Sequence, residues 1–281
     1  MVIMEPLPRA PHAGLDGALR RLGRVVVAFS GGADSAFLAA YATDLLGRDN
    51  VVCVTAVSAS LAEAELRDCE SLASEWNLDW RTVVTNETAR PDYIANAGDR
   101  CFHCKDELMD ALTPIASDLG ATVVLGVNLD DLGDHRPGQE AAAAKGAAFP
   151  MVEAALTKAD VRQLSREMKL RTWDKPAAAC LASRIPYGTA VSVNLLGRID
   201  RAEAAVRAVL DGSIARAYNL RVRHEGDAAR IEVDPEMFPV LAARHGEVVV
   251  ALEALGYRYV TLDLAGFRSG NLNWALGDNR P

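Results

Sequence analysis

The first half of the chain alternates short β-branched runs with longer segments of helical periodicity. The pattern predicts strands at 25–29, 51–56, 80–85 and 122–125, and helices at 34–46, 61–76 and 105–119. Strands joined by crossover helices run parallel, and the helices then cover both faces of the sheet. We therefore expect an N-terminal α/β domain with a doubly wound, mostly parallel sheet.

Further features belong to the same domain. Thr157 and Asp160 have the spacing of a capping box, which predicts a helix start. The apolar run 170–173 is interpreted as a short strand, the alanine-rich patch 141–148 as a helix, and 86–100 as irregular.

The pattern changes after Tyr187. It predicts a helix at 199–210, strands at 218–224 and 229–233 around the turn Glu225-Gly226-Asp227, a helix at 237–255 and a last strand at 257–264. This order indicates a smaller α+β domain. We assign 1–188 to the N-terminal domain and 189–281 to the C-terminal domain.

Composition excludes several classes of protein. The 281 residues are 50% hydrophobic and carry 30 basic against 38 acidic side chains, a net charge of −8, which argues against a surface devoted to nucleic acid or anionic membrane. No run reaches the roughly 18 apolar residues of a membrane span, and the N-terminus lacks a signal-peptide core, so we expect a cytoplasmic protein. The five cysteines then suit thiols, metal ligands or catalysts better than a disulfide framework.

A glycine-rich turn follows the first predicted strand. Its two glycines let the backbone approach an anion, and the next helix offers unpaired N–H groups at its N-terminus. Neither a Walker loop nor a dinucleotide fingerprint is present. The alternative is a plain glycine turn with Asp34 as N-cap. We interpret the segment as a phosphate cradle formed by Ser30, Gly31, Gly32, Asp34 and Ser35.

Three cysteines carry a second signal. Cys101 and Cys104 form a Cys-x-x-Cys pair ahead of a predicted helix, which suits thiolate chemistry or soft-metal ligation. A redox pair and two inert thiols are the alternatives. Cys180 follows the run 170–173, which is interpreted as a strand. Because loops from the carboxyl ends of parallel strands gather at one edge of the sheet, all three thiolates can meet there beside a nucleotide. Three thiolates in one place could be ligands of an iron-sulfur cluster. Cys53 and Cys69 are interpreted as structural.

Other polar residues are candidates around this core. Asn128 and Asp131 follow a strand, with Asp131 suited to magnesium and Arg136 to phosphate; a solvated acidic loop is the alternative. Arg221 and Arg223 share one strand face, an arrangement typical of a salt-bridged sheet surface. Glu203 and Asp234 are weaker candidates for a divalent cation.

The cradle resembles the PP-loop of the ATP pyrophosphatases, a superfamily with the fold described as adenine nucleotide alpha hydrolase-like. The resemblance implies that the loop holds the pyrophosphate end of ATP with Mg²⁺ and that a carboxylate, carbonyl or amide is activated by adenylation.

The loop, the Cys-x-x-Cys-Lys segment and the run 173–188, in this order, resemble the LarE family of pyridinium-3,5-biscarboxylate mononucleotide sulfur transferases over about 19–264. The resemblance implies adenylation of the substrate carboxylate, a thioester at Cys180, and a thiocarboxylate product for the nickel-pincer nucleotide cofactor of lactate racemase. Members with three cysteines are thought to bind a [4Fe-4S] cluster, here on Cys101, Cys104 and Cys180. The substrate nucleotide would contact Lys105, Ser183, Arg184, Arg221 and Arg223.

The resemblance makes 1–188 the ATP-binding and catalytic domain and 189–281 a substrate-binding or oligomerisation domain, and it leaves a homo-oligomer open. Partners are then a small pyridinium mononucleotide, with no nucleic acid and no membrane. The alternatives are a PP-loop tRNA thiolase, an ammonia-using amide synthetase, and a nucleotide-binding regulatory module without enzymatic activity.

Overall fold

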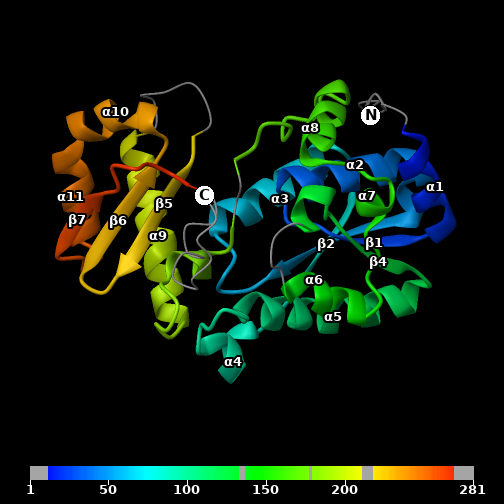
Figure 1. The fold of residues 1–281 in the computed structure, drawn as a ribbon, viewed down its shortest axis with the longest axis horizontal. Helices are drawn as coiled ribbons and strands as arrows, with labels where there is room; N and C mark the ends of the chain where they lie inside the picture. The colour runs from blue at the N-terminus through cyan, green and yellow to red at the C-terminus, as the bar shows by residue number, and fades with distance from the viewer. Residues whose placement is uncertain (1–11, 133–136, 177–178, 211–217, 269–281) are drawn as a thin grey trace. The chain divides into compact units, whose positions relative to one another are not determined.

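The computed structural model describes residues 12–132, 137–176, 179–210 and 218–268 (Figure 1). Arg136, expected to bind phosphate, lies outside these residues. Two compact units interleave along the chain. The first takes the described residues of Met1–Ser58, Glu65–Glu87 and Cys101–Ala178, and the second those of Ala59–Ala64, Thr88–Arg100 and Ala179–Pro281. Residues 179–188 thus pack with the second unit, while the domain division after residue 188 stays a prediction.

The first unit is built on a four-stranded sheet in the order β3-β2-β1-β4. All three pairings are parallel; Val26, for example, lies between Val52 of β2 and Val123 of β4. The predicted parallel α/β sheet is therefore confirmed. Its strands are β1 (Val25–Ala28), β2 (Val51–Val57), β3 (Asp79–Val84) and β4 (Thr122–Leu125).

Both faces of this sheet are covered, as the β-branched runs require. Val25 and Val27 pack into a cluster with α1, α2, α3 and α8, whereas Val26 packs on the opposite side with α5 and α6 (Figure 1). Alternate residues of one strand thus serve two cores. The helices are α1 (Ala13–Leu22), α2 (Ala33–Leu46), α3 (Glu63–Glu75), α5 (Arg100–Leu119), α6 (Pro137–Ala144), α7 (Pro150–Glu153) and α8 (Lys158–Glu167), with short 3-10 turns η1 (Arg48–Asn50), η2 (Glu87–Ala89) and η3 (Leu129–Leu132).

Local signals predicted some helix starts and misplaced others. The capping box is present at α8, where Thr157 accepts from the Asp160 N–H and the Asp160 carboxylate accepts from the Thr157 N–H. Helix α5 begins at Arg100, ahead of the predicted start at 105, because Gly98 is the nearest upstream helix breaker. The stretch 86–100, expected to be irregular, contains η2 and the short helix α4 (Pro91–Ile94). The alanine-rich patch is helical only to Ala144.

The predicted strand at 170–173 is wrong. These residues form turns, because the N–H of Leu170 bonds to Ser165 and the N–H of Trp173 bonds to Leu170. Among the described residues, the sheet continues past β4 only as one isolated parallel bridge, between Val124 of β4 and Ala148. The segment before Cys180 therefore does not follow a strand. The rule that loops gather at the carboxyl ends of parallel strands thus does not place Cys180 beside the nucleotide loop.

The second unit contains a three-stranded sheet in the order β5-β6-β7. Strands β5 (Leu220–Glu225) and β6 (Ala228–Val233) form the predicted antiparallel hairpin, and Gly226 in its turn has φ +65°. Strand β7 (Tyr259–Leu262) runs parallel to β6. Helix α9 (Val193–Leu210) packs its buried face on this sheet.

The structure has two shorter helices in this unit where the sequence predicted one. The structure divides 237–255 into the 3-10 turn η5 (Pro235–Met237), α10 (Phe238–Ala243) and α11 (His245–Glu253). Arg244, between the two helices, has φ −105° and ψ 13°, outside the helical region. No described helix in either unit is long and apolar enough to cross a membrane.

Candidate nucleotide and sulfur-transfer site

The glycine-rich turn joins β1 to α2 as the sequence predicted. Gly31 has φ +69°, and a Cβ there would lie 2.8 Å from the sulfur of Cys69, so a side chain is excluded on both conformational and steric grounds. The Ser35 hydroxyl accepts from the Ser30 N–H at 3.2 Å and donates to the Gly32 carbonyl at 3.2 Å. Gly32 is the N-cap of α2 and has no side chain to cap the helix. The first-turn N–H groups of α2 are thereby left for an anion.

The end of β4 lies against the start of α2. A Cβ on Gly126 would fall 2.7 Å from the Ser35 nitrogen, so only glycine permits this approach. Just beyond it, the buried Asn128 amide donates to the Asp34 carboxylate at 3.1 Å, and the Asn128 N–H donates to Asp131 at 3.2 Å. The structure thus brings two carboxylates predicted from separate motifs to one place.

This arrangement affects the Asp34 carboxyl. Burial raises its pKa, the charge of Asp131 raises it further, and the hydrogen bond from Asn128 opposes both effects. Two neighbouring carboxylates that repel one another beside an anion cradle suit a divalent cation bound together with phosphate.

Lys175 is a residue of this site that sequence reasoning missed. Its ammonium donates to the Gly31 carbonyl at 3.1 Å and forms ion pairs of 2.7 Å with Glu65 and Asp68 of α3. Burial alone lowers the pKa of this ammonium, but the two carboxylates raise it overall. The nearest sequence signal was its place in the run 173–188; its contact with the phosphate loop is a tertiary feature.

The five cysteines, all within the described residues, have different surroundings. Cys53 and Cys69 are fully buried, and burial raises the pKa of the Cys53 thiol and raises that of Cys69 to about 11. Their structural role is therefore supported. Cys101 is exposed, while Cys104 and Cys180 are half-buried.

Cys101 and Cys104 lie inside the beginning of α5, which corrects the expectation that they precede the helix. The dipole argument still applies because both lie near its N-terminus. Lys105 follows them and is half-buried. A Cβ on Gly138 of α6 would lie 2.8 Å from the Cys101 carbonyl and 2.7 Å from Cγ of Lys105, so α6 begins directly against this turn.

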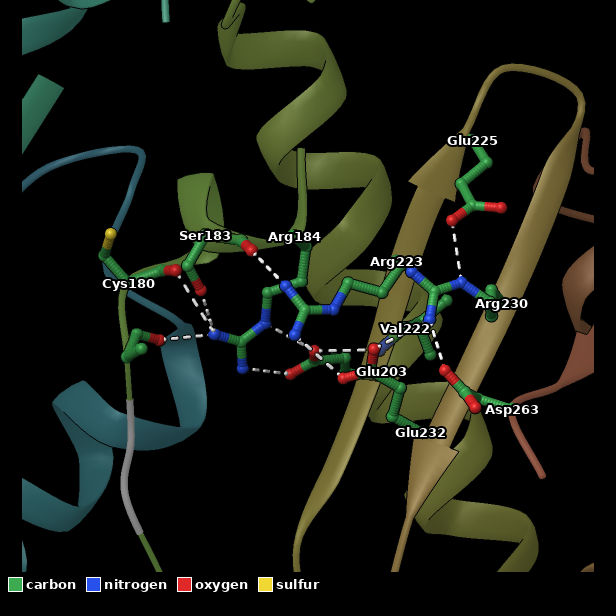
Figure 2. Close-up of polar contacts among 11 residues, drawn as sticks. Cys180, Ser183, Arg184, Glu203, Val222, Arg223, Glu225, Arg230, Glu232 and Asp263 are labelled. Carbon is green, nitrogen blue, oxygen red and sulfur yellow. Dashed lines mark hydrogen bonds and ion pairs between the residues drawn. The ribbon is translucent and has the colours of Figure 1, made fainter. Parts of the chain in front are cut away.

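Cys180 precedes the 3-10 turn η4 (Leu181–Arg184) of the second unit. Its carbonyl accepts from the Ser183 N–H at 2.9 Å and from the Arg184 guanidinium at 3.2 Å. Figure 2 shows its sulfur pointing away from the arginine and glutamate side chains. Within each unit, the described residues hold no group of three or more His, Cys, Asp or Glu side chains arranged to bind a metal. The meeting of Cys180 with Cys101 and Cys104 stays a prediction.

Arg184 and Glu203 form a buried ion pair (Figure 2). Two guanidinium nitrogens contact the two carboxylate oxygens at 2.7 and 3.1 Å, and one oxygen also accepts from the Val222 N–H at 3.1 Å. Burial alone lowers the pKa of the Arg184 guanidinium, but Glu203 raises it overall. The carboxylate proposed for a divalent cation is thus occupied by arginine in this structure.

The two arginines of β5 are buried rather than solvated. Arg223 donates to the Ser183 carbonyl at 2.6 Å and pairs with the fully buried Glu232 at 2.8 Å. Arg221 stacks over the Phe267 ring at 4.5 Å and has no ion pair or hydrogen bond to another described side chain. Burial and the charges of Arg184 and Arg223 lower its pKa to about 10. An inward cation of this kind suits an anionic ligand better than a salt-bridged surface.

Asp234 makes no described hydrogen bond to the buried arginines of this unit or to Glu203. It accepts from the Asn219 N–H and from the Asn219 side chain, both at 2.9 Å, and so fixes the start of β5.

Comparison with known proteins supports the fold and identifies the family. The NAD synthase family profile matches residues 18–98, which include β1, the glycine loop and α2. A pyridinium-3,5-bisthiocarboxylic acid mononucleotide synthase of Lactiplantibacillus plantarum is 36% identical over 265 residues, 94% of each chain. Uncharacterized proteins of Synechocystis sp. and Methanocaldococcus jannaschii are 45% identical, over 91% of this chain and 94% of the relative, and 24% identical, over 88% and 91%.

A parallel sheet whose first strand leads through Ser-Gly-Gly into a helix defines an α/β fold similar to that of NAD synthases. The extent of the similarity to the L. plantarum protein goes further. The chain belongs to the family of pyridinium-3,5-bisthiocarboxylic acid mononucleotide synthases, the LarE family.

Proposed function

We propose that the protein is an ATP-dependent sulfur transferase acting on pyridinium-3,5-biscarboxylic acid mononucleotide in nickel-pincer nucleotide biosynthesis. The observation that carries the proposal is the phosphate cradle at Gly31 and Gly32, with the Asp34 and Asp131 carboxylates beside it, in a chain related over 94% of its length to a bisthiocarboxylate synthase. The cradle supplies the binding of ATP, and the relationship supplies the substrate.

In the first step, a substrate carboxylate oxygen attacks the α-phosphorus of ATP, and the bond to the β-phosphate breaks to release pyrophosphate. The N–H groups at the start of α2 and the hydroxyls of Ser30 and Ser35 bind the leaving pyrophosphate. Asp34, Asn128 and Asp131 offer the oxygen ligands that Mg²⁺ prefers. Arg136 is proposed as a further phosphate ligand.

In the second step, the Cys180 thiolate attacks the acyl-adenylate carbon and expels AMP to form a thioester. Breaking the Cβ–S bond of Cys180, with loss of its α-proton, then leaves a thiocarboxylate on the product and dehydroalanine in the chain. The second unit supplies the substrate phosphate ligands in this proposal, with the buried Arg221 and Arg223 foremost. Lys105, Ser183 and Arg184 are the other proposed contacts.

The residues fit an iron-sulfur cluster in their chemistry. Cys101 and Cys104 are accessible thiols near a helix N-terminus, whereas Cys53 and Cys69 are too buried to act as ligands. Cys101, Cys104 and Cys180 would hold the [4Fe-4S] cluster, which when bound supplies a transferable sulfide and spares Cys180.

Mass spectrometry tests the proposal. After incubation with ATP, Mg²⁺ and the biscarboxylate mononucleotide, we expect a thiocarboxylate product, and dehydroalanine at position 180 in cluster-free protein. Anaerobically reconstituted wild type should hold about four irons and four sulfides per chain, and Cys101→Ala should not. Product formation by Cys180→Ala without a cluster would contradict the role of Cys180.

A further inference from the structure

Two buried polar residues of the stretch 88–100 hold the segment that follows Cys180. Asn96 is fully buried and Arg100 is 3% exposed, and both belong to the same compact unit as residues 179–189. Buried amides and guanidinium groups are costly unless their hydrogen bonds are made, so these two side chains require an explanation.

Asn96 directs its amide at this segment. Its Nδ2 donates to the carbonyls of Pro186 and Thr189, both at 2.8 Å, and the backbone carbonyl of Asn96 accepts from the Gly188 N–H at 3.1 Å. The Asn96 backbone has φ +53°, a left-handed conformation that asparagine tolerates better than most residues. The side-chain NH₂ group and the backbone carbonyl of Asn96 are therefore matched to three backbone groups of the segment.

Arg100 extends the same contact toward Cys180. It donates to Oδ1 of Asn96 and, at 2.9 Å, to the Ala182 carbonyl, and its guanidinium lies over the Tyr187 ring at 5.5 Å. The Leu181 N–H bonds to the Ser60 carbonyl at 2.9 Å. The residues after Cys180 are thus held at 181, 182, 186, 188 and 189 by groups distant in sequence.

We propose that Asn96 and Arg100 are positioning residues for Cys180, which set the place of its sulfur for attack on the activated substrate. The proposal rests on the proposed sulfur transfer. A thiol must approach its target carbon within about 3–3.5 Å, and a displacement of about 1 Å costs about 100-fold in rate. A polar network with all its hydrogen bonds made specifies a single conformation of the segment. Apolar packing alone would specify that conformation less well.

The test uses Asn96→Gly in the full chain, because glycine keeps the left-handed backbone and removes only the amide. Asn77→Gly is the matched control, since Asn77 also has a positive φ of 50° but is exposed in the first unit. Arg100→Lys is a second variant, for use if Asn96→Gly does not fold; it keeps the charge but cannot bond both Asn96 and Ala182 in the same geometry.

Two readouts separate positioning from stability. For Asn96→Gly we expect kcat for thiocarboxylate formation to fall about 100-fold while KM for ATP stays within about twofold. Without ATP or substrate, the rate at which iodoacetamide alkylates Cys180, followed by peptide mass spectrometry, should rise about tenfold as the segment opens. Asn77→Gly should match wild type in both.

Wild-type values of kcat and of alkylation in folded Asn96→Gly or Arg100→Lys would overturn the positioning role and leave sulfur transfer intact. Faster alkylation in the variants, with a wild type that forms no thiocarboxylate, would support the positioning and refute the proposed reaction.

Discussion

The ammonium of Lys175 donates a hydrogen bond to the carbonyl of Gly31, linking the segment ahead of Cys180 to the phosphate loop at 3.1 Å. The same nitrogen forms 2.7 Å ion pairs with Glu65 and Asp68 of α3. One side chain therefore ties together the loop, the helix beside it and the segment 172–176, all within the first unit.

Lys175→Met should weaken nucleotide binding. It removes the bond to Gly31 and leaves two carboxylates facing the loop, where their charge repels phosphate, so we expect KM for ATP in pyrophosphate release to rise about tenfold. Thermal unfolding should show that the free energy of unfolding falls by about 1–3 kcal/mol. Lys145→Met is the matched control, because Lys145 also bridges two carboxylates, Asp106 and Asp110, away from the loop. Equal effects of both variants on KM would refute a specific role for Lys175.

Gly126→Ala should damage the same site from the other side. The added methyl group would lie 2.7–2.9 Å from backbone atoms of Asp34 and Ser35, which cannot move without shifting the start of α2. We expect a loss of about 1–3 kcal/mol in the free energy of unfolding and weaker ATP binding, measured by urea titration and calorimetry. Gly17→Ala in α1 has its nearest contact at 3.5 Å and should be neutral or stabilising. Normal ATP binding by Gly126→Ala would show that the two segments are not in close contact.

Breaking the ion pair between Arg184 and Glu203 should be costly. Both side chains are less than one-tenth exposed, so Arg184→Met leaves a buried carboxylate without its cation. We expect a loss of about 3–5 kcal/mol in urea unfolding, and a double variant with Glu203→Leu that recovers part of it. Arg244→Met, in an exposed pair with Glu247, should change the free energy of unfolding very little, because solvent screens the pair. A loss of that small size for Arg184→Met would contradict the buried pair.

His224 should make the protein less stable in mild acid. Burial lowers the pKa of its imidazole and the Arg198 charge lowers it further, against the opposing charge of Glu225. The centroid of the Tyr257 ring lies 6.0 Å from that of the imidazole. Above the ordinary value of 6.5 the imidazole is neutral in both states. As the pH falls below that value the unfolded chain binds the proton first, so stability is lost until the folded pKa is passed.

The melting temperature from about pH 7.5 to about pH 5.5 tests this expectation. The melting temperature of His224→Gln should fall less in acid than that of wild type. That of His245→Gln, a substitution at an exposed position, should fall as much as in wild type. An unchanged decrease in His224→Gln would assign the effect to other groups.

Much of the first unit could be read from local sequence. The runs at β1, β2 and β4 are β-branched on consecutive residues, which only a sheet covered on both faces accommodates, and Ser30-Gly31-Gly32 carries the loop chemistry in its own backbone preferences. The capping box at Thr157 likewise depends on residues within one turn. These features were predictable because the residues whose interactions fix them lie close together in the sequence.

Other features depended on contacts that no local pattern encodes. The run 170–173 is apolar enough for a strand, but its N–H groups bond back to α8 and its own turn, and no strand remains to pair with it. Arg221 and Arg223 alternate as a surface pair would, yet both are buried, because Ser183, Glu232 and Phe267 cover them.

The sequence by itself determined the parallel sheet and the glycine-rich loop, since both follow from periodicity or from residues close together in the chain. It also determined the family membership, since that follows from similarity over 94% of the chain. Only the tertiary structure decided that Lys175 bonds to Gly31, that Asn128 joins Asp34, and that Asn96 holds the residues after Cys180. Those bonds join residues about 90 to 144 apart, as between Lys175 and Gly31, and the free energy that selects them comes from satisfying polar groups that folding has buried.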